Sequence, residues 1–107
     1  MLKTIKLENG REVKFLSNAL IPMRYQRAFK QNYFQTIVRF SQSGPSSPNQ
    51  TIYRMAWVFA KNADSSIGNL DTWLNSFDNF PIQEVVDILE PLIKNTLSSP
   101  KTKHFRR

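Results

Sequence analysis

The first sixteen residues alternate between apolar and polar side chains, which is the pattern of a half-buried β-strand. The alternation is interrupted at Asn9 and Gly10 and resumes with Val13 and Phe15. Asn-Gly fits the two positive-φ positions of a type I′ turn, the strongest short signal for a hairpin. The pattern therefore predicts a β-hairpin over residues 2–16. Since an isolated hairpin is marginally stable in water, we expect it to pack on helices or to pair with another chain.

Beyond the hairpin, apolar residues recur at spacings of three and four, which is the period of an amphipathic helix. Four helices are predicted, over residues 21–40, 50–62, 71–77 and 81–97. Pro91 lies inside the last of them and is expected to kink or weaken it, because proline lacks the N–H of a helical hydrogen bond. The expected fold class is therefore mostly α with an N-terminal β-hairpin, an α+β arrangement.

The length of 107 residues allows one domain, which is predicted to span residues 1–97. Residues 98–107 begin with Ser-Ser-Pro and carry four basic side chains, so we expect a disordered basic tail there. The stretch 41–48, which is rich in Ser, Gly and Pro, predicts a loop between helices. The sequence thus indicates one globular unit followed by a flexible end.

The formal net charge of +7 is unevenly distributed along the chain. Residues 1–61 carry ten Lys/Arg against two Glu, a net +8, whereas residues 62–97 carry one Lys against six acidic residues, a net −5. Such a dipolar molecule can attract nucleic acid, but it is equally suited to head-to-tail self-association. No apolar segment reaches the roughly 20 residues of a membrane span, and no secretory signal is recognisable, so a soluble intracellular protein is expected.

Catalytic chemistry finds little support in the residues present. The absence of cysteine excludes disulfides, thiolate metal sites and a cysteine nucleophile. The single histidine, His104, falls in the predicted tail, which cannot hold a base against a substrate. Glu84, Asp87 and Glu90 lie three residues apart and are interpreted as a solvated helix face rather than a metal site. We therefore expect no enzyme activity and no bound metal or cofactor.

Surplus aromatic side chains favour a function in binding other proteins. The chain has eight Phe, three Tyr and two Trp, more than four short helices easily hide, and a second apolar side on a helix indicates an interface. The alternative, which stays open, is that the hairpin covers these side chains within one molecule. A nucleic-acid-binding or regulatory role is the second alternative, because the first predicted helix has a basic flank. The candidate interface residues are Tyr53, Trp57, Trp73, Phe77, Phe80, Arg24, Arg27 and Lys30.

The order of five segments along the chain carries a resemblance to a known family. The segments are Val13–Phe15, Pro22–Tyr25 followed by Phe29 and Phe34, Met55–Asp64, Trp73–Leu74 with Phe77, and Ile82–Leu92. The third, Met-Ala-Trp-Val-Phe-Ala-Lys-Asn-Ala-Asp, is similar to an A-Y-x-M-A-K-x-A-D helix of that family. The ordered set covers about residues 3–93 and resembles the tail assembly chaperones of siphophages and prophages of Gram-positive bacteria, in their short, non-frameshifted form. This chain departs from the family in a shorter connection around Gly44 and in a more basic first half.

The resemblance implies a chaperone of virion assembly rather than an enzyme. Its expected client is the tape measure protein, a long and largely helical protein that is bound before the tail tube polymerises around it. The resemblance also implies self-association into rings or spirals, and contacts with a frameshifted longer form and with the tail tube protein. The implied location is the cytoplasm of the host bacterium during phage assembly, and not the mature virion.

Overall fold

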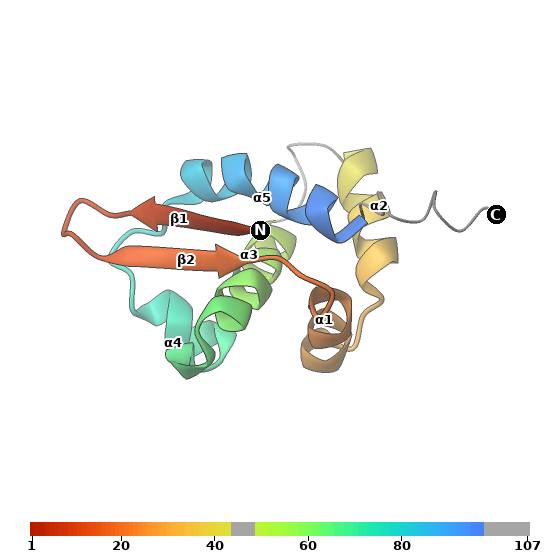
Figure 1. Cartoon of the computed structure of the whole chain (residues 1–107), viewed down its shortest axis with the longest axis horizontal. Coiled ribbons are helices and arrows are strands. Elements are labelled where there is room, and N and C mark those ends of the chain that lie inside the picture. Colours follow the sequence, from red (N-terminus) through yellow and green to blue (C-terminus); the bar gives the residue numbers. More distant parts are fainter. Residues whose placement is uncertain (44–48, 98–107) are drawn as a thin grey trace.

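The computed structural model describes residues 1–43 and 49–97, and it places a two-stranded hairpin against a set of helices (Figure 1). The elements in chain order are β1 (Leu2–Lys6), β2 (Glu12–Leu16), α1 (Ile21–Phe29), α2 (Tyr33–Ser43), α3 (Asn49–Ala63), the 3-10 helix η2 (Ser65–Ile67), α4 (Leu70–Asn75) and α5 (Ile82–Leu97). This order confirms the predicted fold class, mostly α with an N-terminal β-hairpin. The predicted tail over 98–107, which contains His104, and most of the predicted loop over 41–48 lie outside the described residues.

The hairpin has the predicted strands but a different turn. Its antiparallel pairing brings Ile5 opposite Val13, and both side chains are buried against the helices. The Gly10 N–H donates to the Leu7 carbonyl at 3.0 Å, and Gly10 has a φ of 90°, whereas Asn9 keeps a negative φ. The predicted type I′ turn, which needs positive φ at two residues, is therefore wrong. A type I turn followed by a left-handed glycine closes the hairpin instead, because one glycine in that position is sufficient.

The chain forms two helices where the sequence predicted a single one over residues 21–40. At the end of α1, Lys30 adopts the left-handed conformation with a φ of 57°, and its N–H donates to the Gln26 carbonyl at 2.8 Å. Asn32 then starts α2, because its Oδ1 accepts the N–H of Gln35 at 2.9 Å. The prediction of one continuous helix is therefore wrong, and α2 extends beyond the predicted end to Ser43.

The break between α1 and α2 has a packing reason. Tyr25 and Tyr33 are both buried with ring centroids 5.7 Å apart, and the Tyr33 hydroxyl bonds Thr96 Oγ1 at 2.9 Å. On one straight helix, residues eight positions apart are separated by about 12 Å along the axis, so these rings would not meet. Turning the chain at Lys30 allows both aromatic rings to enter the same core.

The other three predicted helices are present with shifted ends. Those predicted over 50–62 and 81–97 are α3 and α5, each within a residue of its predicted boundaries. The helix predicted over 71–77 is the shorter α4. Its N-cap is Asn69, whose side chain accepts a hydrogen bond from the Thr72 N–H. Because α4 ends at Asn75, Phe77 lies in the connection to α5.

Pro91 does not interrupt α5, which runs through it to Leu97. Without an N–H, Pro91 cannot donate to the carbonyl of Asp87, four residues earlier in the helix. Asp87 lies on an exposed part of α5, where water can satisfy that carbonyl, so the missing bond is tolerated. The helix therefore keeps its buried face on both sides of the proline.

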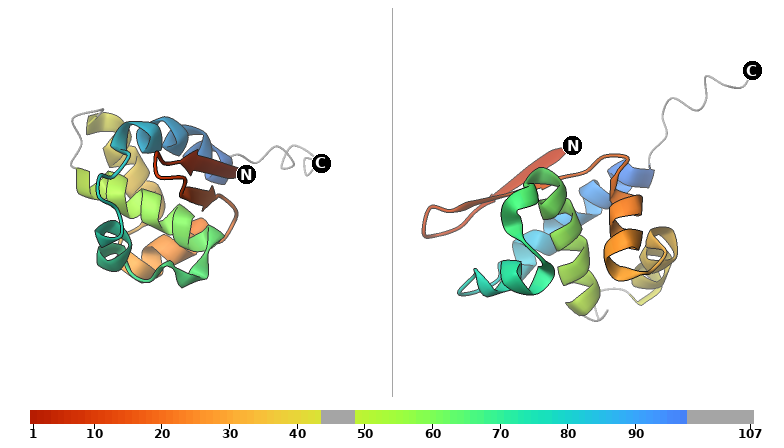
Figure 2. Two further views of the ribbon diagram at one scale, coloured as in Figure 1. Left: turned by 90° about the vertical axis from the view of Figure 1, so that its left-hand side faces the viewer. Right: turned by 90° about the horizontal axis from the view of Figure 1, so that it is seen from below.

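The core lies between the hairpin and the helices α3 and α5. One face of α3 is buried, and its members are Ile52, Met55, Ala56, Phe59 and Ala60. The strand β2 packs along α3 and β1 along α5, so the hairpin covers the groove between these two helices (Figure 2). Where the chain leaves β2, Ser17 is buried and its Oγ donates to the Leu92 carbonyl at 2.8 Å. This bond fixes the end of the hairpin to α5.

Candidate protein-binding surface

Four of the five predicted interface aromatics belong to one internal group, here called the aromatic cluster. Trp73 is 1% exposed, and its ring contacts Phe15 of the hairpin at 6.4 Å, Phe77 at 5.2 Å and Phe80 at 5.6 Å between centroids. Phe77 and Phe80 contact each other at 5.3 Å, and Tyr53 of α3 packs on Phe80 at 5.2 Å. Edge-on pairs of this kind contribute about 0.5–1.5 kcal/mol beyond area burial. The cluster therefore joins the hairpin and the α4–α5 connection to α3.

Arg11 in the hairpin turn covers the outer side of the aromatic cluster. Its guanidinium lies 4.3 Å from the Phe77 ring centroid, and its Nη1 donates to the Ser76 carbonyl at 3.0 Å. The hairpin thus shields aromatic surface within one molecule, which is one of the alternatives that the sequence left open. Sequence reasoning missed Arg11, because 65 residues separate it from its partner.

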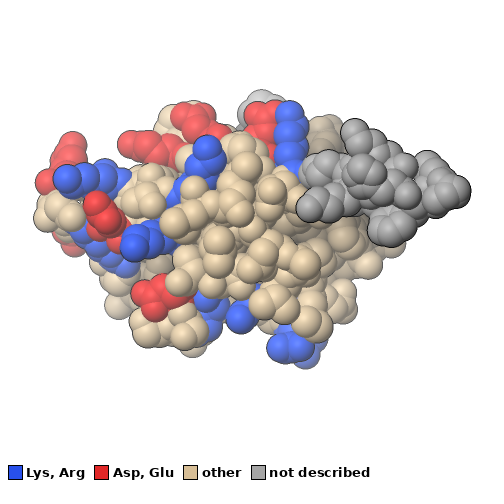
Figure 3. All heavy atoms as spheres, in the orientation of Figure 1, with Lys and Arg blue, Asp and Glu red and all other residues tan. Residues whose placement is uncertain are grey.

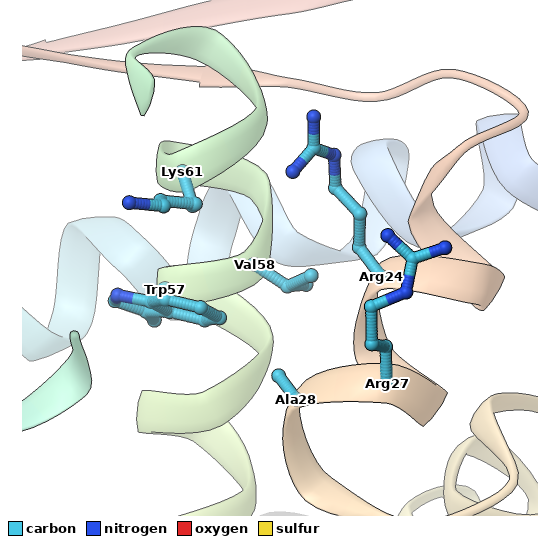
Figure 4. A pocket seen from close by; sticks show the side chains of 6 residues that line it. All are labelled: Arg24, Arg27, Ala28, Trp57, Val58 and Lys61. Atoms are coloured by element: carbon cyan, nitrogen blue, oxygen red, sulfur yellow. The ribbon is translucent and has the colours of Figure 1, made fainter. Parts of the chain in front are cut away.

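Trp57 lies apart from the aromatic cluster and lines a groove of about 150 Å³, here called the α1–α3 groove (Figure 4). The lining residues are Arg24, Arg27 and Ala28 from α1 and Trp57, Val58 and Lys61 from α3. Ala28 and Val58 point toward each other and form an apolar floor, with the two arginines along the α1 side. The Trp57 ring is held by Nε1, which donates to the Gly68 carbonyl at 3.1 Å, and by Phe29 at 5.5 Å. The groove therefore brings together three of the predicted interface residues.

The two arginines of the α1–α3 groove lack a neutralising partner. In the part of the chain that the structure describes, the single ion pair joins Lys94 Nζ to Glu90 at 3.0 Å on α5, far along the sequence from the groove. Neither Arg24 nor Arg27 therefore has a carboxylate within ion-pair distance. Moreover, Arg24 Nε is buried and has no hydrogen-bond partner. The guanidinium groups of Arg24 and Arg27 can therefore pair with an anionic group from outside the molecule, although the buried Nε of Arg24 itself is closed to it.

Lys61, on the α3 side of the groove, has a hydrogen-bond partner within the molecule. Its Nζ donates to the Ser65 carbonyl at 2.7 Å. Hydrogen bonds from Ser66 to the neighbouring Asp64, together with the charges of Lys61 and Lys14, hold the pKa of that carboxyl below its usual value. Asp64 is therefore ionised at neutral pH and offsets part of the charge of Lys61. The unbalanced positive charge of the groove lies on its α1 side.

A second open surface lies on α2, outside the groove. Phe34 and Val38, one helical turn apart, are 48% and 54% exposed. They line a shallow hollow together with Gln35 and Arg39. The remaining predicted interface residue, Lys30, is exposed at the turn between α1 and α2 and does not line the groove. Sequence reasoning missed Val38, although it follows Phe34 by four residues on the same helical face.

Residues 1–43 and 49–97 hold neither a group of metal ligands nor a membrane-spanning helix. Within these ranges, no three or more Asp and Glu side chains form a group that could hold a metal. Burial raises the pKa of Tyr33 to about 12 and raises that of Tyr25 as well, so both phenols stay protonated at neutral pH. Over the same ranges, no helix is long and apolar enough to cross a membrane.

Comparisons with models of protein families, with curated proteins and with solved structures find no match for this chain. The molecule is therefore characterised by its own geometry, a helical α+β fold with an aromatic cluster packed under the hairpin and, away from it, the α1–α3 groove and the α2 surface. Of these surfaces, the α1–α3 groove is cationic with an apolar floor, and the α2 surface is mainly apolar.

Proposed function

We propose that this protein is a tail assembly chaperone of a siphophage or prophage of a Gram-positive bacterium, which binds the tape measure protein and self-associates during tail morphogenesis. The observation that carries the proposal is the presence of two separate open surfaces, the α1–α3 groove and the α2 surface. A protein that holds a client and also binds its own copies needs two such surfaces. The ordered resemblance of residues 3–93 to that family supplies the identity of the client.

The α2 surface suits an apolar face of a helical client. Phe34 and Val38 offer two apolar side chains at the spacing of one helical turn, and Arg39 beside them can pair with a carboxylate of the client. Covering an apolar stretch of the tape measure protein in this way lowers its tendency to aggregate before the tube forms. The protein then acts in the host cytoplasm and leaves before the virion matures. A frameshifted longer form and the tail tube protein are its further proposed partners.

Co-expression with the tape measure protein of the same phage tests the proposal. We expect the wild-type chain to raise the soluble fraction of the tape measure protein and to co-purify with it. The double variant Phe34→Ser/Val38→Ser should lose both effects, because it removes the apolar contact. Leu2→Ser, which replaces another exposed apolar residue on β1, serves as the matched control and should retain them. A tape measure protein that stays insoluble beside the wild-type chain would contradict the proposal.

Nucleic-acid binding remains the second candidate, because the unpaired arginines of the groove and the net charge of +7 favour polyanions. Titration with a short DNA duplex separates the two functions. Non-specific binding by charge alone weakens steeply with salt, so the chaperone proposal expects no micromolar affinity at about 150 mM salt. Micromolar or tighter binding that persists at this salt concentration would favour the nucleic-acid function instead.

A further inference from the structure

The α1–α3 groove requires an occupant that is both acidic and apolar. Its apolar lining is formed by the exposed Ala28 and the half-buried Trp57 ring over the fully buried Val58, so an apolar side chain can cover Ala28 and Trp57 there. Its α1 side presents the guanidinium groups of the half-buried Arg24 and the exposed Arg27. A carboxylate next to an aliphatic side chain therefore satisfies both parts of the groove at once.

The outer face of α5 has this combination of side chains. Val86 is 37% exposed, and Gln83 and Glu90, three residues before it and four after it, lie on the same side of the helix. Asp87 is adjacent to them, is exposed, and has no ion-pair partner among the described residues. Three acidic side chains against the single Lys94 give α5 a net negative charge. The face thus offers an apolar residue bordered by carboxylates.

The groove and the acidic face lie on opposite sides of the molecule. Seen from below, α1 and α3 stand side by side in front and α5 lies behind them (Figure 2). Figure 3 shows acidic side chains, with basic ones among them, along the upper edge over α5, and basic side chains along the lower edge around α1, with acidic ones further along over α4. One copy therefore cannot satisfy its own groove with its own α5, but a second copy can.

We propose that the α1–α3 groove of one copy binds the outer face of α5 of a second copy, with Val86 on the apolar floor and Asp87 facing Arg24 and Arg27. The inference rests on the proposed self-association and names its contact. Because the two surfaces differ, the contact is heterologous and leaves a free groove and a free α5 at the ends, so copies add to form an open chain or ring. A nucleic-acid backbone fits less well, since phosphates bring no apolar group to cover Ala28 and the Trp57 ring.

Charge reversal on each surface tests this contact in sedimentation velocity experiments. The wild-type chain should show a concentration-dependent rise in mass. Arg27→Glu and Asp87→Arg should each weaken association at least about tenfold, because like charges then face each other. An equimolar mixture of the two variants should associate again, since each supplies the surface that the other has lost. Raising the salt to about 1 M, where the Debye length falls from about 10 Å to about 3 Å, should weaken the wild-type assembly.

Lys6→Glu changes the net charge as Arg27→Glu does but lies on β1, outside both surfaces, and should leave association unchanged. A wild-type chain that stays monomeric at all concentrations would falsify the contact, as would equal loss of assembly in Lys6→Glu. The proposal would also be overturned if the wild-type chain were a monomer that binds a DNA duplex with micromolar affinity and Arg27→Glu abolished this binding. The groove would then be a nucleic-acid site. Retention of the tape measure protein by Arg27→Glu is measured separately, so failure of the contact and failure of the chaperone function remain distinguishable.

Discussion

Two regions of this molecule each combine an arginine with an aromatic side chain, but the arginine is bound by neighbouring groups in only one of them. In the aromatic cluster, Arg11 stacks on Phe77 and donates to a backbone carbonyl, while Trp73 beneath is fully buried. In the α1–α3 groove, Arg27 lines the same hollow as Trp57 but has no carboxylate partner in the described residues. The comparison shows that an arginine with partners inside the molecule, such as Arg11, marks an internal contact. An arginine without such partners, such as Arg27, marks a surface open to another molecule.

The reach of the hairpin explains the difference between the two regions. Its turn extends over the connection between α4 and α5, where Arg11 meets Ser76. Its other end stops at Leu16, whose carbonyl accepts a hydrogen bond from Asn62 of α3 at 3.0 Å. From there the chain turns away into α1, so no strand covers the groove between α1 and α3. The hairpin therefore packs on the aromatic cluster and does not reach the α1–α3 groove.

The largest expected effect comes from removing the two tryptophans in turn. Trp73→Ala should lower the free energy of unfolding by about 3–5 kcal/mol, because it leaves a cavity among packed aromatic rings. Trp57→Ala should cost about 1–2 kcal/mol, since its half-buried ring loses less contact area and one hydrogen bond to Gly68. Urea denaturation followed by circular dichroism measures both. Equal losses in the two variants would erase the distinction between a closed and an open region.

A smaller loss of stability is expected from removing the hydrogen bond of the buried Tyr33 hydroxyl, near the α1–α2 turn. Tyr33→Phe should cost about 1 kcal/mol at neutral pH, because it removes the hydrogen bond to Thr96. In the wild-type chain, the folded pKa of Tyr33 of about 12 lies above its ordinary value of 10.0. The contribution of the buried phenol is therefore complete below pH 10 and is lost as pH rises toward 12.

The variant has no phenol to ionise at this position, so its stability deficit relative to the wild type should narrow between pH 10 and 12. Measuring unfolding of both chains across this range is the check, because the ionisation of Lys and of Tyr25 is common to both. A deficit that stays constant with pH would show that Tyr33 is not buried as described.

The fold class was predictable because it depends on local periodicity, whereas the break between α1 and α2 depends on a ring contact that periodicity does not contain. Alternation of two identified the hairpin, and spacings of three and four identified the helices, since each period reflects one buried face. The helix break at Lys30 was not predicted, because the helical spacing of apolar residues continues across Lys30. The break is required by the contact between the rings of Tyr25 and Tyr33. The turn at Gly10 was misassigned because Asn-Gly is compatible with more than one turn type.

The candidate site was predictable only in part, for a related reason. Helical spacing placed Tyr53 and Trp57 on a second apolar side of α3, but it does not tell which of them another element will cover. The structure puts Tyr53 against Phe80 and leaves Trp57 in the groove. Arg24 lines that groove as the basic first helix suggested, because it faces α3 across the apolar floor. These assignments depend on the path of the hairpin, which no local pattern contains.

The smallest effect concerns the two arginines that define the comparison. Arg11→Ala should lower the free energy of unfolding by about 0.5–1.5 kcal/mol, because it removes the contact with Phe77 and the bond to the Ser76 carbonyl. Arg27→Ala should change it by less than about 0.5 kcal/mol, since an exposed side chain without partners contributes little to the fold. Denaturation at a concentration where both variants are monomeric separates folding from assembly. If Arg27→Ala destabilised the monomer as much as Arg11→Ala, the groove would be a structural element of the fold rather than an open surface.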